Sequence, residues 1–112
     1  MTSSVRLPRF TFRRVTRDDI ALMHRWLNLP HVKVWWGNNT SLTELAREYG
    51  EYIDGVEPIE AYIVGYEGRE IGHTQWARYA DYAWYGAILG LTEHEIAGGA
   101  NCDVFIGDSS LL

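Results

Sequence analysis

Cysteine is almost absent from this sequence, and long apolar runs are absent altogether. Cys102 is the only cysteine among the 112 residues, so no disulfide can form within the chain, and a reducing, cytoplasmic setting is expected. Because cysteine behaves as a small hydrophobic residue, we expect Cys102 to lie in the core. No segment approaches the roughly 20 consecutive apolar residues of a membrane span. The N-terminus also lacks the apolar stretch of a secretory signal.

The short motifs of several enzyme classes are missing as well. There is no GxSxG, no phosphate-binding P-loop and no GxGxxG, so nothing supports a serine hydrolase, a P-loop NTPase or a Rossmann-fold enzyme. The four histidines are scattered without the spacing of metal ligands, and we expect no metal site. They are His24, His31, His73 and His94.

Lysine and arginine are absent from residues 79–112, although the chain holds 10 such residues in all. The same stretch carries five carboxylates, Asp81, Glu93, Glu95, Asp103 and Asp108. An acidic segment of this kind would attract a cationic ligand and repel nucleic acid. A solvated acidic surface with no ligand is the alternative interpretation. The basic residues gather instead in residues 1–33, where no nucleic-acid recognition motif accompanies them.

The first half of the sequence predicts one strand and two helices. Residues 9–15 begin with the apolar–polar alternation of a half-buried strand. Thr16 and Asp19 resemble a capping box, and a helix should follow and end near Asn28, because Pro30 disfavours helical geometry in the residue before it. We expect a loop over residues 31–39, which contains two tryptophans. A second helix should then begin at the Ser41–Glu44 capping box and end before Gly55 and Pro58.

The second half predicts a hairpin and one further strand. Residues 60–66 and 70–79 read as two strands joined by the turn at residues 67–69. Residues 80–100 should be irregular, because they contain four glycines. Residues 102–107 should form a short apolar strand. The order strand, helix, helix, strand, strand, loop, strand predicts a single α+β domain over residues 1–112 with an antiparallel sheet.

Two aromatic pairs, Trp35–Trp36 and Trp84–Tyr85, fall in expected loops, where aromatic side chains often present a binding surface. Flat aromatic faces can contact sugar rings and attract ammonium groups. The alternative is that these side chains anchor their loops to the core, and we expect one residue of each pair to do so.

Asp103 is the second candidate for a binding site. It precedes the apolar run Val104–Ile106, and a carboxylate buried there would be costly without a partner. A substrate ammonium would be a suitable partner. A salt bridge or a strand-end cap is the alternative.

Three segments together resemble the GNAT N-acetyltransferases, and most closely the aminoglycoside 6′-N-acetyltransferases. The first is Phe12–Ile20 followed by Trp26-Leu27-Asn28-Leu29-Pro30-His31-Val32 and Trp35-Trp36-Gly37. The second is the hairpin from Ala61 to Gln75, which is similar to the family's second and third strands. The third is Cys102–Gly107, which is similar to the fourth strand, where an Asp lies near the acceptor amine.

The resemblance implies a function and a set of site residues. Acetyl would pass from acetyl-CoA to a primary amine of an aminoglycoside-like polycation, an antibiotic-resistance activity, with no metal. Asp103 would position the amine and help to remove its proton, and backbone groups of Val104, Phe105 and Ile106 would bind acetyl-CoA. The acceptor would contact Trp35 or Trp36, Trp84, Tyr85 and, although it lies out of register with the family's acidic residue, Asp81.

The resemblance also implies that residues 1–112 correspond to the N-terminal half of a GNAT fold, without the acetyl-CoA loop and the C-terminal half. The fourth strand would then expose an edge, which favours a homo-oligomer or pairing with a complementary fragment. Two alternatives to the aminoglycoside enzyme stay open. One is a non-catalytic remnant that binds cationic small molecules, and the other is a lysine N-acyltransferase of siderophore synthesis.

Overall fold

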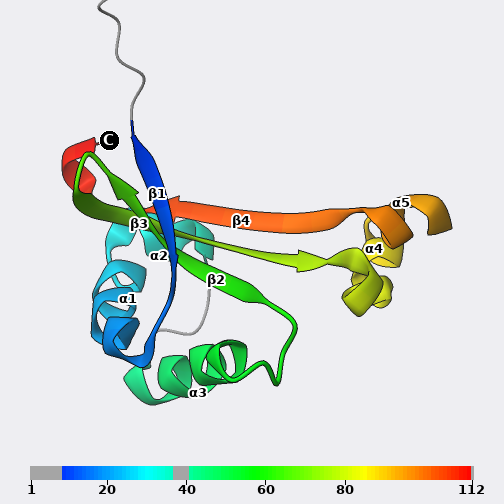
Figure 1. The fold of residues 1–112 in the computed structure, drawn as a ribbon, viewed down its shortest axis with the longest axis horizontal. Coiled ribbons are helices and arrows are strands. Elements are labelled where there is room, and N and C mark those ends of the chain that lie inside the picture. Colours follow the sequence, from blue (N-terminus) through cyan, green and yellow to red (C-terminus); the bar gives the residue numbers. More distant parts are fainter. Residues whose placement is uncertain (1–8, 37–40, 112) are drawn as a thin grey trace, which may run out of the picture.

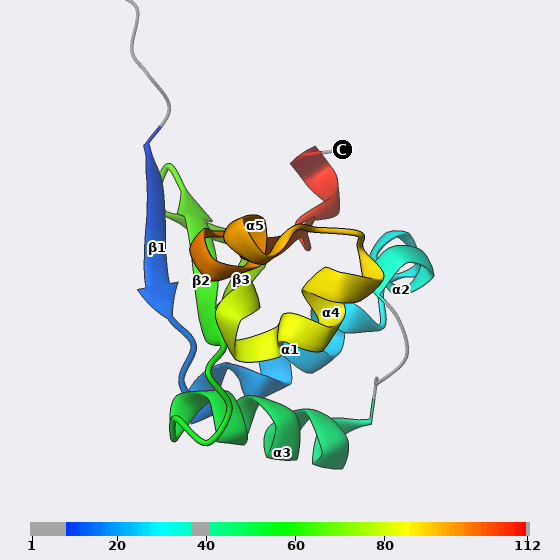
Figure 2. The same ribbon diagram turned by 90° about the vertical axis from the view of Figure 1, so that its right-hand side faces the viewer.

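A four-stranded antiparallel sheet organises the chain in the computed structural model, which describes residues 9–36 and 41–111. The sheet order is β1-β2-β3-β4, and helices α1–α3 cover one of its faces (Figures 1 and 2). The strands are β1 (Phe10–Arg14), β2 (Glu60–Tyr66), β3 (Arg69–Arg78) and β4 (Ala100–Ile106). The helices are α1 (Ile20–Leu27), α2 (Pro30–Trp36), α3 (Leu42–Ile53), α4 (Ala83–Ile88) and α5 (Glu93–Gly98). Short 3-10 turns occupy Arg17–Asp19, Tyr79–Tyr82 and Ser109–Leu111. The predicted α+β class and antiparallel sheet are confirmed.

The turn between β2 and β3 requires backbone that glycine favours. Glu67 and Gly68 both have positive φ, 48° and 80°, as the central residues of a type I′ hairpin turn do. The predicted hairpin is therefore confirmed, with its turn in the expected place. A register shift between Val64 and Gly65 interrupts the ladder between β2 and β3.

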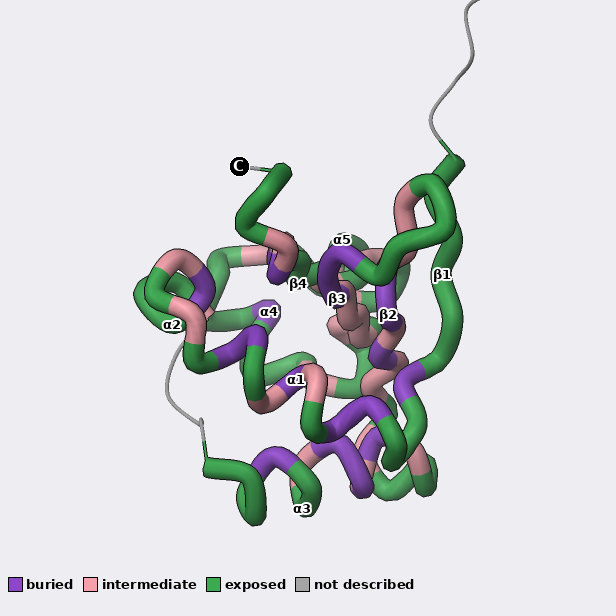
Figure 3. Tube along the Cα trace, turned by 90° about the vertical axis from the view of Figure 1, so that its left-hand side faces the viewer, coloured by how far each residue is buried: buried purple, intermediate pink, exposed green. Residues whose placement is uncertain are grey.

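The core lies between α1, α3 and the sheet. Its fully buried side chains include Met23, Leu45, Tyr49, Ile63 and His73. Figure 3 shows these buried segments on α1, α3, β2 and β3, while β1 is exposed along its length. A buried histidine at the centre of an apolar core was not predicted from the sequence.

Two expectations about local structure are wrong. Residues 31–36 are helical, because Pro30 is the first residue of α2 rather than a barrier beyond α1; proline is well tolerated there since the first helical N–H has no partner in the helix. Residues 80–100 contain α4 and α5 rather than irregular chain. Thr92 caps α5 by accepting a hydrogen bond from the Glu95 N–H, and Glu95 reciprocates at the Thr92 N–H.

Strands β3 and β4 extend beyond the helical layer as a two-stranded arm, with α4 and α5 at its far end (Figure 1). Cys102 pairs with Trp76 and projects from the face of β4 opposite to Phe105 and the core, so it is exposed and the expectation of a core cysteine is wrong. In the described residues, no helix is long and apolar enough to cross a membrane.

Candidate functional site

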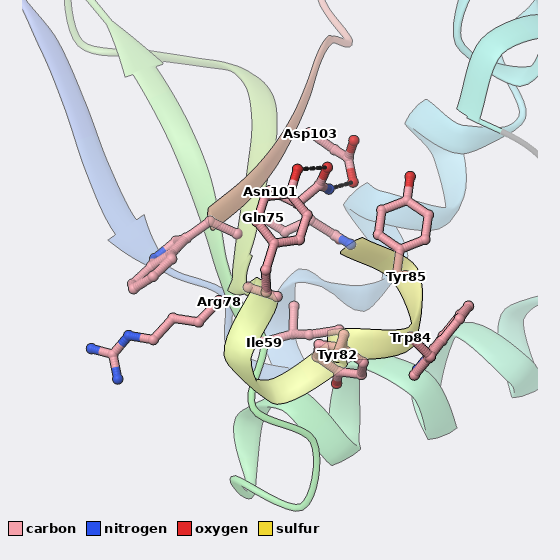
Figure 4. Close-up of a pocket in the computed structure, with 11 residues that line it drawn as sticks. Ile59, Gln75, Arg78, Tyr82, Trp84, Tyr85, Asn101 and Asp103 are labelled. Carbon is pink, nitrogen blue, oxygen red and sulfur yellow. Dashed lines mark hydrogen bonds between the residues drawn. The ribbon is translucent and has the colours of Figure 1, made fainter. Parts of the chain in front are cut away.

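A pocket open to solvent lies where the β3–β4 arm leaves the helical layer, between the arm and α4 (Figure 4). It is lined by Ile59, Gln75, Trp76, Ala77, Arg78, Tyr79, Tyr82, Trp84, Tyr85, Asn101 and Asp103. We call it the arm pocket. It contains three of the predicted site residues, Trp84, Tyr85 and Asp103.

Gln75 and Asp103 are adjacent on the floor of the arm pocket. They are Cα partners in the antiparallel pairing of β3 with β4, as His73 and Phe105 are one step nearer the core. Directly paired residues project from the same face of a sheet, so the face that packs the core continues outward as Gln75 and Asp103. Asp103 is exposed rather than buried, and its Oδ2 accepts a hydrogen bond of 3.2 Å from Asn101 Nδ2. The expected cost of burying this carboxylate therefore does not arise.

Trp84 and Tyr85 form the aromatic wall opposite that floor (Figure 4). Their rings meet edge to face with centroids 5.8 Å apart, and Tyr85 also stacks on Tyr79. Trp84 is 65% exposed and Tyr85 is 37% exposed. Neither side chain anchors the segment to the core, so the expectation that one of them would do so is wrong. The physical reason is that α4 packs on the arm and not on the helical layer.

The only arginine that lines the arm pocket does not neutralise it. The Arg78 guanidinium lies over the Trp76 ring, 5.7 Å from its centroid, and points away from Asp103 (Figure 4). Arg78 and Trp76 alternate with Gln75 and Ala77 along β3, and side chains at alternate positions of a strand point to opposite faces. The Asp103 carboxylate therefore faces the opening without a neighbouring cation among the lining residues.

Beneath the floor, a buried hydrogen-bond network connects the core to the arm pocket. His73 Nδ1 lies 2.9 Å from the Tyr62 carbonyl oxygen, and Nε2 lies 3.0 Å from the Gln75 side-chain amide. The Tyr49 hydroxyl lies 3.3 Å from His73 Nε2 and 3.2 Å from the same Gln75 atom. Burial lowers the pKa of His73 below its ordinary 6.5, against the raising effects of Gln75, the Tyr62 carbonyl and Asp103. Burial likewise raises the pKa of Tyr49.

Asp81 is not in the arm pocket. It lines a separate hollow at the other side of the 3-10 turn Tyr79–Tyr82, together with Arg14, Tyr52 and Glu57. In that hollow the Tyr82 hydroxyl donates a hydrogen bond of 2.6 Å to Glu57 Oε2. The structure therefore does not bring Asp81 together with Trp84, Tyr85 and Asp103.

Trp35 and Trp36 also lie elsewhere, in a groove between α2 and β4 that we call the edge groove. It is lined by His31, Val32, Trp35, Trp36, Val104, Phe105 and Ile106. Trp36 anchors α2 through edge-to-face contacts with Phe105 and His73, whereas Trp35 is 87% exposed. For this pair the expectation of one anchored and one free side chain is confirmed.

The edge groove borders the free edge of β4. The Gly107 N–H donates to the Ile71 carbonyl on β3, and backbone groups alternate in direction along an antiparallel strand. The backbone of Val104 and Ile106 is therefore directed away from β3. His31 Nε2 lies within hydrogen-bond distance of the Ile106 carbonyl oxygen, at 2.8 Å. No other strand of the described residues pairs with this edge. Within those same residues, no cluster of three or more His, Cys, Asp or Glu side chains is arranged to hold a metal ion.

A family model described as an acetyltransferase (GNAT) domain matches residues 15–110. The chain belongs to the GNAT acetyltransferase family. Aminoglycoside N(6′)-acetyltransferases type 1 from Klebsiella pneumoniae and Serratia marcescens are each 34% identical to it over 106 residues, which cover 91% of this chain and 50% of theirs. The chain of this GNAT protein thus spans about half the length of the curated relatives it matches.

Solved structures share the GNAT fold. The acetyltransferase AAC(6′)-Ib, in complex with paromomycin and acetyl-CoA, superposes with a TM-score of 0.70 at 24% identity, covering 92% of this chain and 56% of that one. An uncharacterised protein from Bacillus halodurans gives 0.74 at 18% identity, covering 92% and 50%. The resemblance stated from the sequence is confirmed at the level of the family and the fold.

Several residues of the arm pocket were missed by the sequence reasoning. Gln75 stood in a segment used for the resemblance, yet nothing in the sequence paired it with Asp103. Asn101 and Tyr79 were not singled out, and their link, a hydrogen bond from the Tyr79 hydroxyl to Asn101 Oδ1, depends on the register of the arm. Only the strand pairing could have identified them.

Proposed function

We propose that this chain binds the amine acceptor of an N-acetyltransferase, which transfers acetyl from acetyl-CoA to a primary amine of an aminoglycoside-like polycation. The observation that carries the proposal is the Asp103 carboxylate, exposed on the floor of the arm pocket opposite Trp84 and Tyr85. The names of the relatives supply the reaction: the matched enzymes are aminoglycoside N(6′)-acetyltransferases. One solved GNAT neighbour is a complex with coenzyme A and kanamycin.

The arm pocket suits a cationic sugar for two physical reasons. Its carboxylate can receive an ammonium group as a charge-assisted hydrogen bond, which is about twice as strong as a neutral one. Its aromatic wall offers ring faces to a sugar or an ammonium, and a cation–π contact contributes roughly 0.5–2 kcal/mol. Arg78 should repel a cationic ligand only weakly, because its guanidinium points away from Asp103 (Figure 4).

The chemistry asks Asp103 to do more than bind. An amine attacks a thioester only when it is neutral, so the ammonium that docks must first lose a proton to a nearby base. Asp103 is the carboxylate in the arm pocket that can accept this proton, directly or through water. Asp81 faces a separate hollow, so we assign it no part in this step.

Acetyl-CoA, when bound, supplies the acetyl group as a thioester, and the β4 edge has groups that fit it. The Val104 backbone is directed away from β3 and borders the edge groove, while the Ile106 carbonyl is held by His31. Val104 directly follows Asp103 in β4. β4 therefore presents the Asp103 carboxylate from its face, where it can bind the amine. It presents the backbone N–H of the next residue, Val104, from its edge, where it can donate a hydrogen bond.

The test is thiol release from acetyl-CoA by the 112-residue chain, with and without kanamycin. The proposal expects release that requires kanamycin and disappears in Asp103→Ala. A chain that binds kanamycin without releasing thiol would be confined to acceptor binding. A folded chain that binds no kanamycin at all would contradict the acceptor assignment.

A further inference from the structure

We propose that His73 is a positioning residue for the acceptor site: it orients the Gln75 side-chain amide so that the carbonyl oxygen faces the arm pocket beside Asp103. The inference rests on the proposed function for the identity of the ligand, but its structural part does not depend on any ligand. It follows from the proton positions that the buried network allows.

The tautomer of His73 is fixed by the backbone. Nδ1 lies 2.9 Å from the Tyr62 carbonyl oxygen, and a carbonyl oxygen only accepts, so Nδ1 carries a proton. A neutral ring then has a bare Nε2, which can only accept. An imidazolium ring has a second proton at Nε2 and can only donate there.

The group that faces Nε2 must therefore donate a hydrogen bond when the ring is neutral and accept one when the ring is charged. The structure places Gln75 Oε1 at 3.0 Å from Nε2, which is a hydrogen bond only for the imidazolium. With a neutral ring two acceptors would face each other, and the Tyr49 hydroxyl has one proton with which to satisfy either of them. Rotating the Gln75 amide by half a turn exchanges its oxygen and nitrogen in place. The Tyr49 hydroxyl then receives an N–H from Gln75 and donates its own proton to the bare Nε2, so every polar group in the network has a partner.

The charge of His73 therefore determines which amide atom reaches the arm pocket. His73 is fully buried, and burial disfavours its charged form. The titratable groups that act on it are Tyr49 from α3 and Asp103 from β4, while α2 contributes the uncharged Trp36 ring. Near neutral pH the ring is neutral, so Gln75 presents its oxygen to the opening. Protonation reverses the amide and presents an NH2 group there.

The second amide atom of Gln75 is free to serve a ligand. No hydrogen bond joins it to another group of the described chain, and among those residues no buried side-chain nitrogen or oxygen lacks a partner. That atom is consequently open to the pocket that Gln75 lines. An oxygen there adds a neutral acceptor to the Asp103 carboxylate, which favours an ammonium group. An NH2 group at the same position would disfavour the binding of an ammonium group.

The first experiment needs no ligand. Nuclear magnetic resonance of the isotope-labelled 112-residue chain would measure the two ring-nitrogen shifts of His73 and the contacts of the Gln75 NH2 protons as pH falls. We expect a bare Nε2 near neutral pH, with Gln75 NH2 close to the His73 and Tyr49 rings, and loss of these contacts as His73 protonates. Gln75 NH2 protons that lie near Tyr85 or Trp84 while His73 is neutral would overturn the proposal.

The second experiment is a double-mutant cycle on kanamycin affinity, measured by calorimetry near neutral pH. We expect Gln75→Leu to weaken binding about 10-fold, the equivalent of one hydrogen bond to a charged group. His73→Phe should weaken binding in the parent chain and have no further effect in the Gln75→Leu background. Equal effects of His73→Phe in both backgrounds would indicate a merely structural role and overturn the proposal.

The two experiments separate the failure of this inference from that of the proposed function. A parent chain that binds no kanamycin would contradict the acceptor assignment, while the ring-nitrogen and amide measurement would still decide how His73 orients Gln75. If His73→Phe did not fold, as urea unfolding would show, the same measurement on the parent chain would decide it.

Discussion

Gln75 and Asp103 project side by side from paired positions of β3 and β4, one step beyond the buried pair His73 and Phe105. The same face of the sheet is thus core for one pair and the floor of the arm pocket for the next. The change occurs where the arm leaves the helical layer (Figure 1). Two paired strands form this floor, and a buried hydrogen-bond network lies beneath it.

Removing the Asp103 carboxylate should abolish the proposed reaction while leaving the fold intact. Asp103→Asn keeps the size of an exposed side chain, so the midpoint of urea unfolding should change little. Kanamycin-dependent thiol release should fall about 100-fold or more, the scale of losing a positioned acid–base group. Cys102→Ser is the matched control, since Cys102 is exposed, adjacent, and on the opposite face. A comparable loss in Cys102→Ser would argue against a specific role for Asp103.

Two exposed tryptophans line different hollows, Trp84 the arm pocket and Trp35 the edge groove. Trp84→Ala should weaken kanamycin binding about 3- to 30-fold, because the aromatic wall of the arm pocket would lose a ring of the kind that contributes roughly 0.5–2 kcal/mol to a cation. Trp35→Ala removes a still more exposed ring, 87% against 65%, but from the edge groove. Trp35→Ala should bind kanamycin as tightly as the parent chain does in calorimetry. Weaker binding by Trp35→Ala with unchanged binding by Trp84→Ala would indicate that kanamycin binds in the edge groove instead.

Close packing of β3 on β4 makes Gly72 sensitive to substitution. A Cβ at this position would lie 2.3 Å from the Phe105 carbonyl oxygen, which is backbone and has no room to yield. Gly72→Ala should therefore lower the free energy of unfolding by about 1–3 kcal/mol, the usual cost of overpacking. Gly98→Ala is the control, because nothing lies within 4 Å of the added methyl. Urea unfolding of both variants checks the prediction, and equal midpoints would contradict it.

Asp19 should contribute stability that depends on pH. The hydrogen bond from Arg13, the cap at Thr16 and the charge of Arg13 hold the pKa of the Asp19 carboxyl below its ordinary 3.8, against desolvation. A lowered pKa stabilises the fold above pH 3.8, and this contribution is lost as pH falls through the folded-state pKa. Asp19→Asn should cost about 1 kcal/mol near neutral pH, since half-exposed Arg13 is screened by solvent.

Urea unfolding at several pH values measures this effect. The difference between Asp19→Asn and the parent chain should shrink as pH falls below 3.8. Asp18 is an exposed neighbour, and Asp18→Asn should have the same unfolding midpoint as the parent chain at each pH. A difference that stayed constant with pH would show that Asp19 acts through packing rather than through its charge.

The fold was predictable from the sequence where local signals agreed with packing. The β2–β3 hairpin was predictable because two strand-like segments flank a short turn that contains Gly68. Helix α2 was missed because Pro30 suits both the end of one helix and the first residue of the next. Helices α4 and α5 were missed because each has only six residues, too short to show a helical period among the glycines.

The site was only partly predictable, for a reason of topology. Residue chemistry singled out Asp103, Trp84 and Tyr85, which the arm pocket brings together. It also singled out Trp35 and Asp81, which lie in other hollows, because a residue's type does not say which face of the sheet it reaches. Gln75 and His73 gained significance only from the register between β3 and β4.

The central claim is that the arm pocket binds the acceptor, and the indole N–H signals of the tryptophans test it most directly. The isotope-labelled 112-residue chain would be titrated with kanamycin near neutral pH and followed by nuclear magnetic resonance. The account predicts that the Trp84 indole signal shifts, together with the Gln75 amide and the Asp103 backbone, while the Trp35 indole signal stays in place. A shift at Trp35 with Trp84 unchanged, or no shift in a folded sample, would contradict it.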